Sequence, residues 1–498
     1  MKLHKPVIMV LCMFAVLLTA TAAVARLDDA IYRGRVKDFK AAIKSKDYSD
    51  AAHQAELVAE DDSTRAVEVL LSETLKSKNG QLFKAVAGVL AGMKNAGALM
   101  TMICVFKGSK WEEQIIVAQA FGLRDGEPSL NTLMDALKLK REEVLRVVLE
   151  SLLKRRCPAM VEPLIKFLEE HEPSGGRLCG DARNILRRIT GQRYGTAASY
   201  RAWWEKNGGK DFVKPKKIKS KERFTTASFF GVEVDSKRCV FIIDVSGSMR
   251  ITDPLPPPDD GKEEGEGDSP ETGKGLIDKD KDDDDDDEGY APVDPSASRV
   301  RIERAKAELI KVVQSIKKDA KFTIIIFSGP GGGMKKGDDQ QKRNEMARRP
   351  LSPGYNPTKN GTVQFWKKRL VAASDSNKKS AVEFVKDFQA FGATFTDDVL
   401  KEAFKIKEAD TFYFLTDGMP DKRAYRRDGI TTPSTEEILK LVADLNAIRH
   451  VRINTFGFID RGRRAGMRRI PRGPSGSDFA EFLKKLAKEN GGKFREIR

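Results

Sequence analysis

Two patterns of apolar and polar residues divide this chain of 498 residues. Between Leu27 and Asn207, apolar residues recur at intervals of three and four, a period that predicts amphipathic α-helices. The segment 141–153 shows this period most clearly, because its apolar residues fall on one face: Val144, Leu145, Val148, Leu149 and Leu152. From about residue 224 onward, short unbroken apolar runs alternate with amphipathic helical segments. That alternation is typical of buried parallel strands joined by helices.

The helical half also shows a repeat. Helices are expected to start near residues 112, 142 and 177, a spacing of roughly 30 to 35 residues that is typical of stacked helical hairpins. The segments 51–60, 64–75 and 82–93 fit the same scheme less cleanly, and a non-repetitive helical bundle is the alternative. The pattern resembles HEAT-type repeats. That resemblance implies an all-α domain over residues 26–207 with an extended surface for binding proteins.

The helical half ends in an aromatic segment. Residues 189–195 read Ile-Thr-Gly-Gln-Arg-Tyr-Gly, and Tyr200, Trp203 and Trp204 come next. An ending of this kind after helical repeats resembles segments of exported bacterial proteins. We expect the two tryptophans to form an apolar cap on the last repeat, and a ligand platform is the less favoured alternative.

After residue 298 the chain alternates helices and strands. Strands are expected over 321–328, 411–416, 452–458 and 493–497, and helices over 299–316, 378–388, 398–405, 434–450 and 478–489. Strands separated by helices predict βαβ units and a mostly parallel, doubly wound, Rossmann-like α/β sheet. The segment 226–234 precedes the first strand and is expected to pair at the edge of the sheet or to pack on it.

The apolar run 239–243 leads directly into Asp-Val-Ser-Gly-Ser at residues 244–248. An unbroken apolar run that ends at a glycine turn predicts a strand buried on both faces. Ligands of open α/β sheets bind beyond the carboxyl ends of such strands. Asp244, Ser246 and Ser248 offer only oxygen atoms there, and hard cations such as Mg²⁺ or Mn²⁺ prefer oxygen ligands.

The Asp-x-Ser-x-Ser segment resembles the metal-ion-dependent adhesion site (MIDAS) of the von Willebrand factor type A (VWA) domain. That family carries a threonine after a glycine-rich loop and an aspartate at the end of a later strand. Thr394 follows Gly392 closely, and Asp417 ends the apolar run 411–416. The three pieces occur in the family's order, which makes the resemblance specific. Each piece also has an ordinary alternative, since serine and threonine cap helices and an Asp-Gly pair forms turns.

The resemblance implies a VWA domain that binds a partner and catalyses no reaction. Asp244, Ser246 and Ser248 would ligate Mg²⁺ or Mn²⁺, and Thr394 and Asp417 would complete the site directly or through water. An acidic side chain of a protein partner would fill the open position. Two other interpretations stay open. One is metal-dependent phosphoryl hydrolysis, although no activating base is identifiable by motif, and the other is a helical scaffold whose VWA domain is only structural.

The first 25 residues predict a secretory signal peptide. Lys2 and Lys5 give a basic start, residues 7–20 are apolar, and Ala23-Val24-Ala25 is a small-residue cleavage site. An uncleaved membrane anchor is the alternative, although the apolar run is short for a spanning helix. We therefore expect a non-enzymatic protein that is exported to the periplasm or the cell exterior, without a transmembrane span after cleavage. The net charge of +16 suits an anionic partner, but export argues against nucleic acid.

Two segments follow neither the helical nor the α/β pattern. Residues 208–223 are rich in lysine and are expected to form a basic linker between the helical domain and a VWA domain over 224–498. Residues 252–298 carry prolines, glycines and the aspartate run 282–287, with almost nothing apolar to bury. This composition predicts a disordered acidic insertion, and its place beside the metal site suggests that it could shield that site. Long basic loops are expected at 329–362 and 460–477.

Overall fold

The computed structural model of this protein describes residues 26–108, 110–209, 212, 227–253, 298–329, 362–421, 431–459 and 476–497. They belong to two compact units. One unit comprises the residues up to Glu172 together with 181–220, and the other comprises Pro173–Gly180 together with the residues from Lys221 onward. The expected signal peptide, most of the basic linker, nearly all of the acidic insertion and most of the two basic loops lie outside the described residues.

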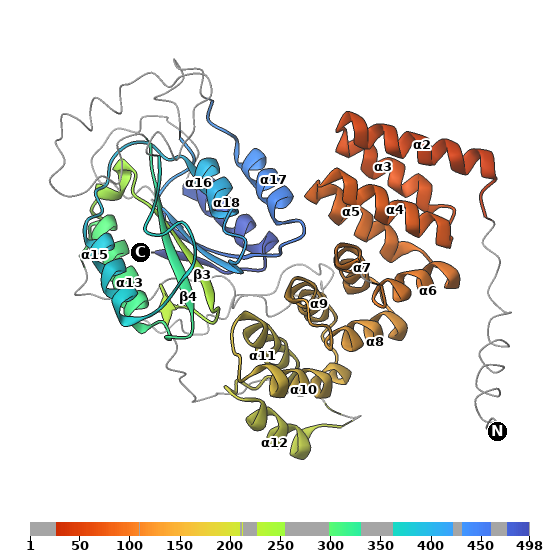
Figure 1. Ribbon diagram of the computed structural model, residues 1–498, viewed down its shortest axis with the longest axis horizontal. Coiled ribbons are helices and arrows are strands. Elements are labelled where there is room, and N and C mark those ends of the chain that lie inside the picture. Colours follow the sequence, from red (N-terminus) through yellow and green to blue (C-terminus); the bar gives the residue numbers. More distant parts are fainter. Residues whose placement is uncertain are drawn as a thin grey trace, which may run out of the picture. The chain divides into compact units, whose positions relative to one another are not determined.

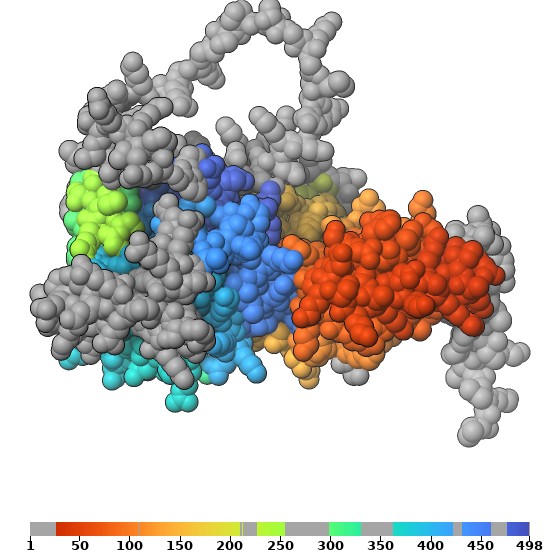
Figure 2. All heavy atoms as spheres, turned by 90° about the horizontal axis from the view of Figure 1, so that it is seen from above, coloured from red at the N-terminus to blue at the C-terminus, as the bar shows by residue number. Residues whose placement is uncertain are grey.

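The first unit consists of successive helices (Figure 1). They are α2 (Asp29–Ser45), α3 (Tyr48–Ala59), α4 (Thr64–Ser77), α5 (Gly80–Gly92), α6 (Ala96–Val105), α7 (Trp111–Leu123), α8 (Glu127–Ala136), α9 (Glu142–Arg155), α10 (Val161–His171), most of α11 (Arg177–Thr190), and α12 (Ala197–Asn207). In Figure 2 the red and orange atoms of the first helices form one closely packed body. None of the helices in the described part of the chain is long and apolar enough to cross a membrane.

Two arginines repeat the same capping contact one helical hairpin apart. Arg124 donates from Nη1 to the carbonyl oxygens of Ala91, at 3.1 Å, and Met93, at the end of α5. Arg155, 31 residues later, donates from Nη1 to the carbonyl oxygens of Phe121, at 3.1 Å, and Arg124, at the end of α7. A cation is favourable beside the free carbonyl groups of a helix C-terminus. The repeated geometry supports the predicted period of roughly 30 to 35 residues.

Trp203 and Trp204 lie in α12 and gather with Phe212 into an aromatic cluster. Their ring centroids lie 5.9 Å and 5.1 Å from that of Phe212. Both indole side chains belong to half-buried residues. This cluster fits the apolar cap that the sequence predicts for the end of the helical unit.

The second unit is organised around one sheet, which has seven strands in the described residues. They are β3 (Arg238–Asp244), β4 (Lys321–Phe327), β5 (Val363–Phe365), β6 (Val371–Ala372), β7 (Thr411–Thr416), β8 (Arg452–Phe458) and β9 (Phe494–Ile497). Their order is β5-β4-β3-β7-β8-β9, with β6 also paired to β4. β3, β4, β7, β8 and β9 run parallel, whereas β5 and β6 run antiparallel to β4. The sequence does not predict β5 and β6, because three and two residues are too few to show a period.

Helices cover both faces of this sheet (Figure 1). On one face lie α13 (Arg301–Ser315) and α15 (Asp375–Lys386), and on the other lie α16 (Thr396–Ala403), α17 (Thr435–Asn446) and α18 (Gly476–Glu489). Strand β3 contributes side chains to the hydrophobic cores on both faces of the sheet. Phe241 packs in the core beneath α13 and α15, and Val240 and Ile242 pack in the core beneath α16, α17 and α18. Burial on both faces explains its unbroken apolar run. The predicted fold class, a helical region and a doubly wound α/β domain, is confirmed.

The segment before β3 forms a small antiparallel hairpin, β1 (Ser228–Phe229) and β2 (Val232–Glu233). The sequence left open whether this segment pairs with the sheet or packs on it, and packing is observed. The ring of Phe229 lies 5.6 Å from that of Phe241 and 4.9 Å from that of Phe456. The hairpin therefore extends the core between the sheet and α13.

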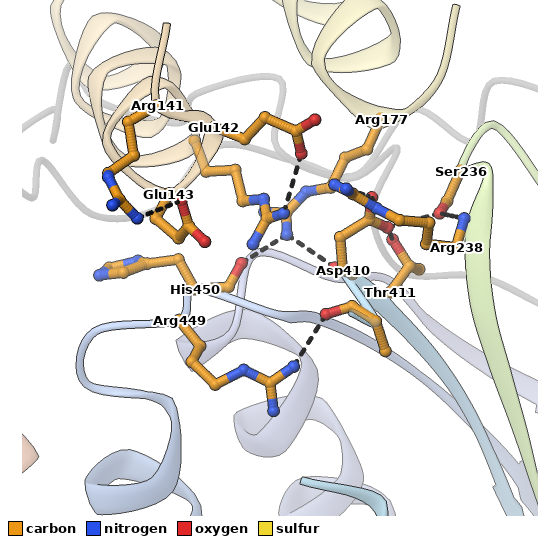
Figure 3. A network of polar contacts seen from close by, with 12 residues as sticks. Arg141, Glu142, Glu143, Arg177, Ser236, Arg238, Asp410, Thr411, Arg449 and His450 are labelled. Carbon is orange, nitrogen blue, oxygen red and sulfur yellow. Dashed lines mark hydrogen bonds and ion pairs between the residues drawn. The ribbon is translucent and has the colours of Figure 1, made fainter. Parts of the chain in front are cut away.

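The first turn of α11 belongs to the second unit, where it is fixed at the amino ends of two strands (Figure 3). Arg177 is 3% exposed and donates from Nη1 to the carbonyl oxygens of Asp410, at 2.8 Å, and His450. These carbonyl groups precede β7 and β8, so one guanidinium ties the starts of two neighbouring strands. Nothing in the sequence pattern predicts this contact, because Arg177 is remote from both strands along the chain.

Candidate metal centre

The predicted motif lies where two parallel strands end. β3 ends at Asp244, and its neighbour β7 ends one residue before Asp417. The strands pair in parallel, with Ile243 opposite Leu415, so both carboxylates reach the same edge of the sheet. Asp244 is fully buried and Asp417 is 8% exposed. The packing of the two core layers therefore places two acidic groups in a buried position at the carboxyl ends of the strands.

Hydrogen bonds join four of the five predicted ligands into one chain. Asp244 accepts from the N–H of Ser246 on Oδ1, at 2.7 Å, and from the hydroxyl of Thr416 on Oδ2, at 2.6 Å. The hydroxyl oxygens of Ser246 and Ser248 lie 3.1 Å apart. Ser248 in turn donates to Asp417 Oδ1 at 2.6 Å. The fold thus brings together the residues that the motif order selects.

A glycine-rich loop approaches the serine turn closely. The N–H of Gly247 donates to the carbonyl oxygen of Gly392 at 2.9 Å. Gly392 has a φ of +83°, which glycine adopts without strain, and a Cβ there would lie 3.0 Å from the carbonyl oxygen of Gly329. A residue with a side chain would disturb this approach of three backbone segments.

Thr394, the fifth predicted ligand, stands two residues beyond Gly392 on the same loop. It is buried and exchanges two backbone hydrogen bonds with Asp421, at 3.2 Å and 3.0 Å. In the described residues, Thr394 is connected to the other four predicted ligands through the backbone of its loop, where Gly392 accepts the hydrogen bond from Gly247. The structure therefore brings the Thr394 loop, as the motif order predicts, against the serine turn.

Burial raises the pKa of both carboxyl groups at this site. For Asp244 burial is the largest cause, and the neighbouring Asp417 raises the pKa further, while hydrogen bonds from Thr416 and Ser246 lower it. For Asp417 burial again has the largest effect, against the lowering effects of Ser248 and Arg301. A raised pKa at both of these neighbouring carboxyl groups indicates negative charge that is only partly compensated.

The sequence pattern misses two contributors to this site. Arg301, in the first turn of α13, donates from Nη1 to Asp417 Oδ2 at 3.1 Å and is itself 4% exposed. The acidic insertion separates it from the motif, and its only sequence signal is that it opens the next helix. Thr416 is missed because a threonine in a buried strand looks like an ordinary β-sheet residue.

The side chains present fit a hard divalent cation. They combine two carboxylates with hydroxyl groups, which are ligand types that Mg²⁺ and Mn²⁺ accept. No group of three or more His, Cys, Asp or Glu side chains is placed to hold a metal in the described residues. A cation at these strand ends would be held by hydroxyl oxygens together with the two carboxylates, as the Asp-x-Ser-x-Ser spacing implies.

Comparison with known proteins gives partial matches. No family model matches the chain. Human "von Willebrand factor A domain-containing protein 3A" is 29% identical over 133 residues, which are 27% of this chain and 9% of that protein. Human "von Willebrand factor A domain-containing protein 3B" is 34% identical over 62 residues, which are 12% of this chain and 5% of that protein. The matched segments thus span less than a tenth of either relative.

Among solved structures, "von Willebrand factor type A from Catenulispora acidiphila" aligns at 15% identity and a TM-score of 0.22, over 51% of this chain and 42% of that one. The motif order, the parallel sheet that joins Asp244 to Asp417 and the matches to the two human relatives agree with one another. The α/β domain is therefore similar to von Willebrand factor type A domains over part of its length, and a helical N-terminal region precedes it.

Proposed function

We propose that this protein binds a protein partner through a divalent cation held by its VWA domain. The observation that carries the proposal is the hydrogen-bonded chain from Asp244 through Ser246 and Ser248 to Asp417. It gathers oxygen ligands and partly compensated negative charge at the carboxyl ends of β3 and β7. Open α/β sheets bind their ligands at such strand ends.

In this proposal Asp244, Ser246 and Ser248 ligate Mg²⁺ or Mn²⁺, and Thr394 and Asp417 complete the site directly or through water. The bound cation supplies a positive centre that accepts an acidic side chain of the partner. The protein residues contribute rigidity, because the buried strands β3 and β7 fix both carboxylates. Mg²⁺ commonly keeps water or a partner's group among its ligands, which leaves room for such an exchange.

The wider role that we propose is a non-enzymatic, exported binding scaffold. The helical repeats would present a second interaction surface, as stacked helical hairpins commonly do. Export to the periplasm or the cell exterior rests on the predicted signal peptide at residues 1–25.

The test is a calorimetric titration of residues 26–498 with Mg²⁺ and with Mn²⁺. Asp244→Ala removes the buried carboxylate, whereas Asp135→Ala removes an acid on α8 whose side chain is 78% exposed. We expect saturable binding in the wild type and in Asp135→Ala, and none in Asp244→Ala, with equal helix content by circular dichroism. Binding that persists in Asp244→Ala, or that is absent from the folded wild type, would contradict the proposal.

The partner is then sought by affinity capture in Mg²⁺ and in excess EDTA. We expect the relevant protein to be retained by the wild type only with Mg²⁺ and not by Asp244→Ala. A partner that binds equally in EDTA would use a different surface, and the helical unit would be the first one to examine.

A further inference from the structure

Arg301 joins the candidate metal site to another buried carboxylate. Its Nη1 donates to Asp417 Oδ2 at 3.1 Å, and its Nε donates to Asp253 Oδ1 at 2.8 Å. Arg304, one turn later in α13, donates to Asp253 Oδ2 at 3.1 Å. The charged groups therefore alternate in sign from the metal site outward: Asp417, Arg301, Asp253 and Arg304.

Neighbouring elements hold this charge network in place. Thr252 and Val300 form an antiparallel bridge, which brings the residues on both sides of the acidic insertion together. The ring of Phe458, at the end of β8, lies 5.8 Å from the guanidinium carbon of Arg301 and 5.2 Å from that of Arg304. Arg301 is thus confined between an aromatic ring and two carboxylates, and it has little freedom to move away from Asp417.

Both oxygens of Asp417 are engaged, Oδ1 by the Ser248 hydroxyl and Oδ2 by Arg301. With every group ionised, Asp244, Asp417, Asp253, Arg301 and Arg304 carry a net charge of −1, and without Arg301 they would carry −2. A divalent cation therefore leaves the site at about +1 with Arg301 and at about zero without it. A residual positive charge is what attracts an external carboxylate.

We propose that Arg301 sets the charge of the metal site. It weakens the binding of the divalent cation itself and leaves the metal-loaded site positive, so that an acidic ligand is attracted. This inference rests on the proposed function, since it concerns the same site. Asp253 moderates the effect, because its carboxylate offsets part of the charge of Arg301.

If Arg301 had only a structural role, the variants would change the metal affinity in a different direction. If the guanidinium only positioned Asp417, then any variant that loosens the contact would lower the affinity for the metal. If it sets the charge, then removing positive charge raises the affinity, and removing the compensating charge of Asp253 lowers it. The direction of the change therefore distinguishes the two roles.

The experiment titrates Mg²⁺ alone into residues 26–498 by calorimetry and compares four variants. We expect Arg301→Met to bind about tenfold more tightly than the wild type, and Arg304→Met about twofold more tightly, because its charge lies farther away. Arg301→Lys keeps the charge and should stay within about twofold of the wild type, and Asp253→Asn should bind about threefold more weakly. Thermal unfolding in EDTA checks that each variant is folded, and Arg304→Met leaves the contact between Arg301 and Asp417 intact.

Tighter binding by Arg301→Met or by Arg304→Met, with weaker binding by Asp253→Asn, supports the inference. Weaker or unchanged binding by both methionine variants overturns it while the wild type still binds Mg²⁺, and the proposed function then stands. If the wild type fails to bind but Arg301→Met binds, Arg301 sets the charge so strongly that the proposed function fails. If neither binds, both proposals fail.

Discussion

Strand β7 runs between two buried aspartates, Asp410 before its first residue and Asp417 after its last, and the two have different surroundings. Asp410 accepts from the Ser236 hydroxyl at 2.5 Å and pairs with Arg238 at 3.1 Å. Figure 3 shows this cluster at the amino ends of the strands, with Arg177 beside it. Asp417 instead lies near a second buried carboxylate, Asp244, and its ion-pair partner Arg301 also pairs with Asp253.

Burial alone therefore does not mark a functional acid in this domain. At the amino ends of the strands each acid has a cation of its own, since Asp235 likewise pairs with Arg452 at 3.0 Å. At the carboxyl ends the two acids of the network and the neighbouring Asp244 make three acids for two arginines, Arg301 and Arg304. A buried ion pair stabilises the fold only while both the acid and the base are present. Partly compensated charge indicates a place for a further cation.

The largest expected effect is the loss of stability when Asp410 is removed. Asp410→Ala leaves Arg238 and Ser236 without their acceptor at a buried position, and we expect the metal-free protein to lose about 3 kcal/mol of unfolding free energy. Asp417→Ala should cost less than about 1 kcal/mol, because it also relieves the repulsion of Asp244. Urea unfolding in EDTA measures both. A larger loss in Asp417→Ala than in Asp410→Ala would reverse the comparison.

The next largest expected effect is the stabilisation of the folded protein by Mg²⁺ bound at the carboxyl ends of β3 and β7. At a Mg²⁺ concentration of about 100 times the dissociation constant, binding to the folded state should add about 2.7 kcal/mol to the unfolding free energy. Thermal unfolding of Asp244→Ala should show no such gain, because this variant lacks the carboxylate that we propose as the principal ligand of the cation. The variant Asp235→Asn, altered at the opposite strand ends, should keep the full gain. A gain in Asp244→Ala equal to that of the wild type would place the cation elsewhere.

A smaller effect is expected from the loop that carries Thr394. Thr394→Val keeps the shape of the side chain and removes its hydroxyl, and we expect Mg²⁺ affinity to fall about tenfold, or about 1.4 kcal/mol. Thr394→Ser restores a hydroxyl and should stay close to the wild type. Calorimetry compares the two. Equal affinities would mean that the loop supports the serine turn through its backbone alone.

Much of this architecture follows from the sequence pattern. The strands β3, β7 and β8 are predicted because their residues are buried on both faces, and an unbroken apolar run records that burial directly. The meeting of Asp244 with Asp417 follows from parallel pairing, since parallel strands bring their carboxyl ends to one edge. The motif residues are thus predictable as a group, together with the edge at which they gather.

The compensating charges are not predictable in the same way. Arg301 and Arg177 each contact residues that are far away in the sequence. In a chain with 33% charged residues, a single arginine carries no distinguishing pattern. The short strands β5 and β6 escape detection because a strand of two or three residues shows no alternation. Periodicity thus predicts the layers and strand ends, whereas the charge balance at those ends depends on tertiary contacts.

The smallest expected effect is a pH dependence that belongs to the carboxyl ends. Asp244 faces Asp417, with Arg301 and Asp253 beyond, and burial raises its pKa above that of an ordinary carboxyl group. The folded state then binds this proton more tightly than the unfolded state, so the stability of the metal-free protein should fall as pH rises from about 4 toward about 7. Urea unfolding in EDTA between about pH 5 and about pH 8 measures the loss, which Asp244→Asn should reduce. Saturating Mg²⁺ should oppose it, because the cation binds the ionised carboxylate. An unchanged slope in Asp244→Asn would assign the pH dependence to other groups and weaken the contrast between the two ends of β7.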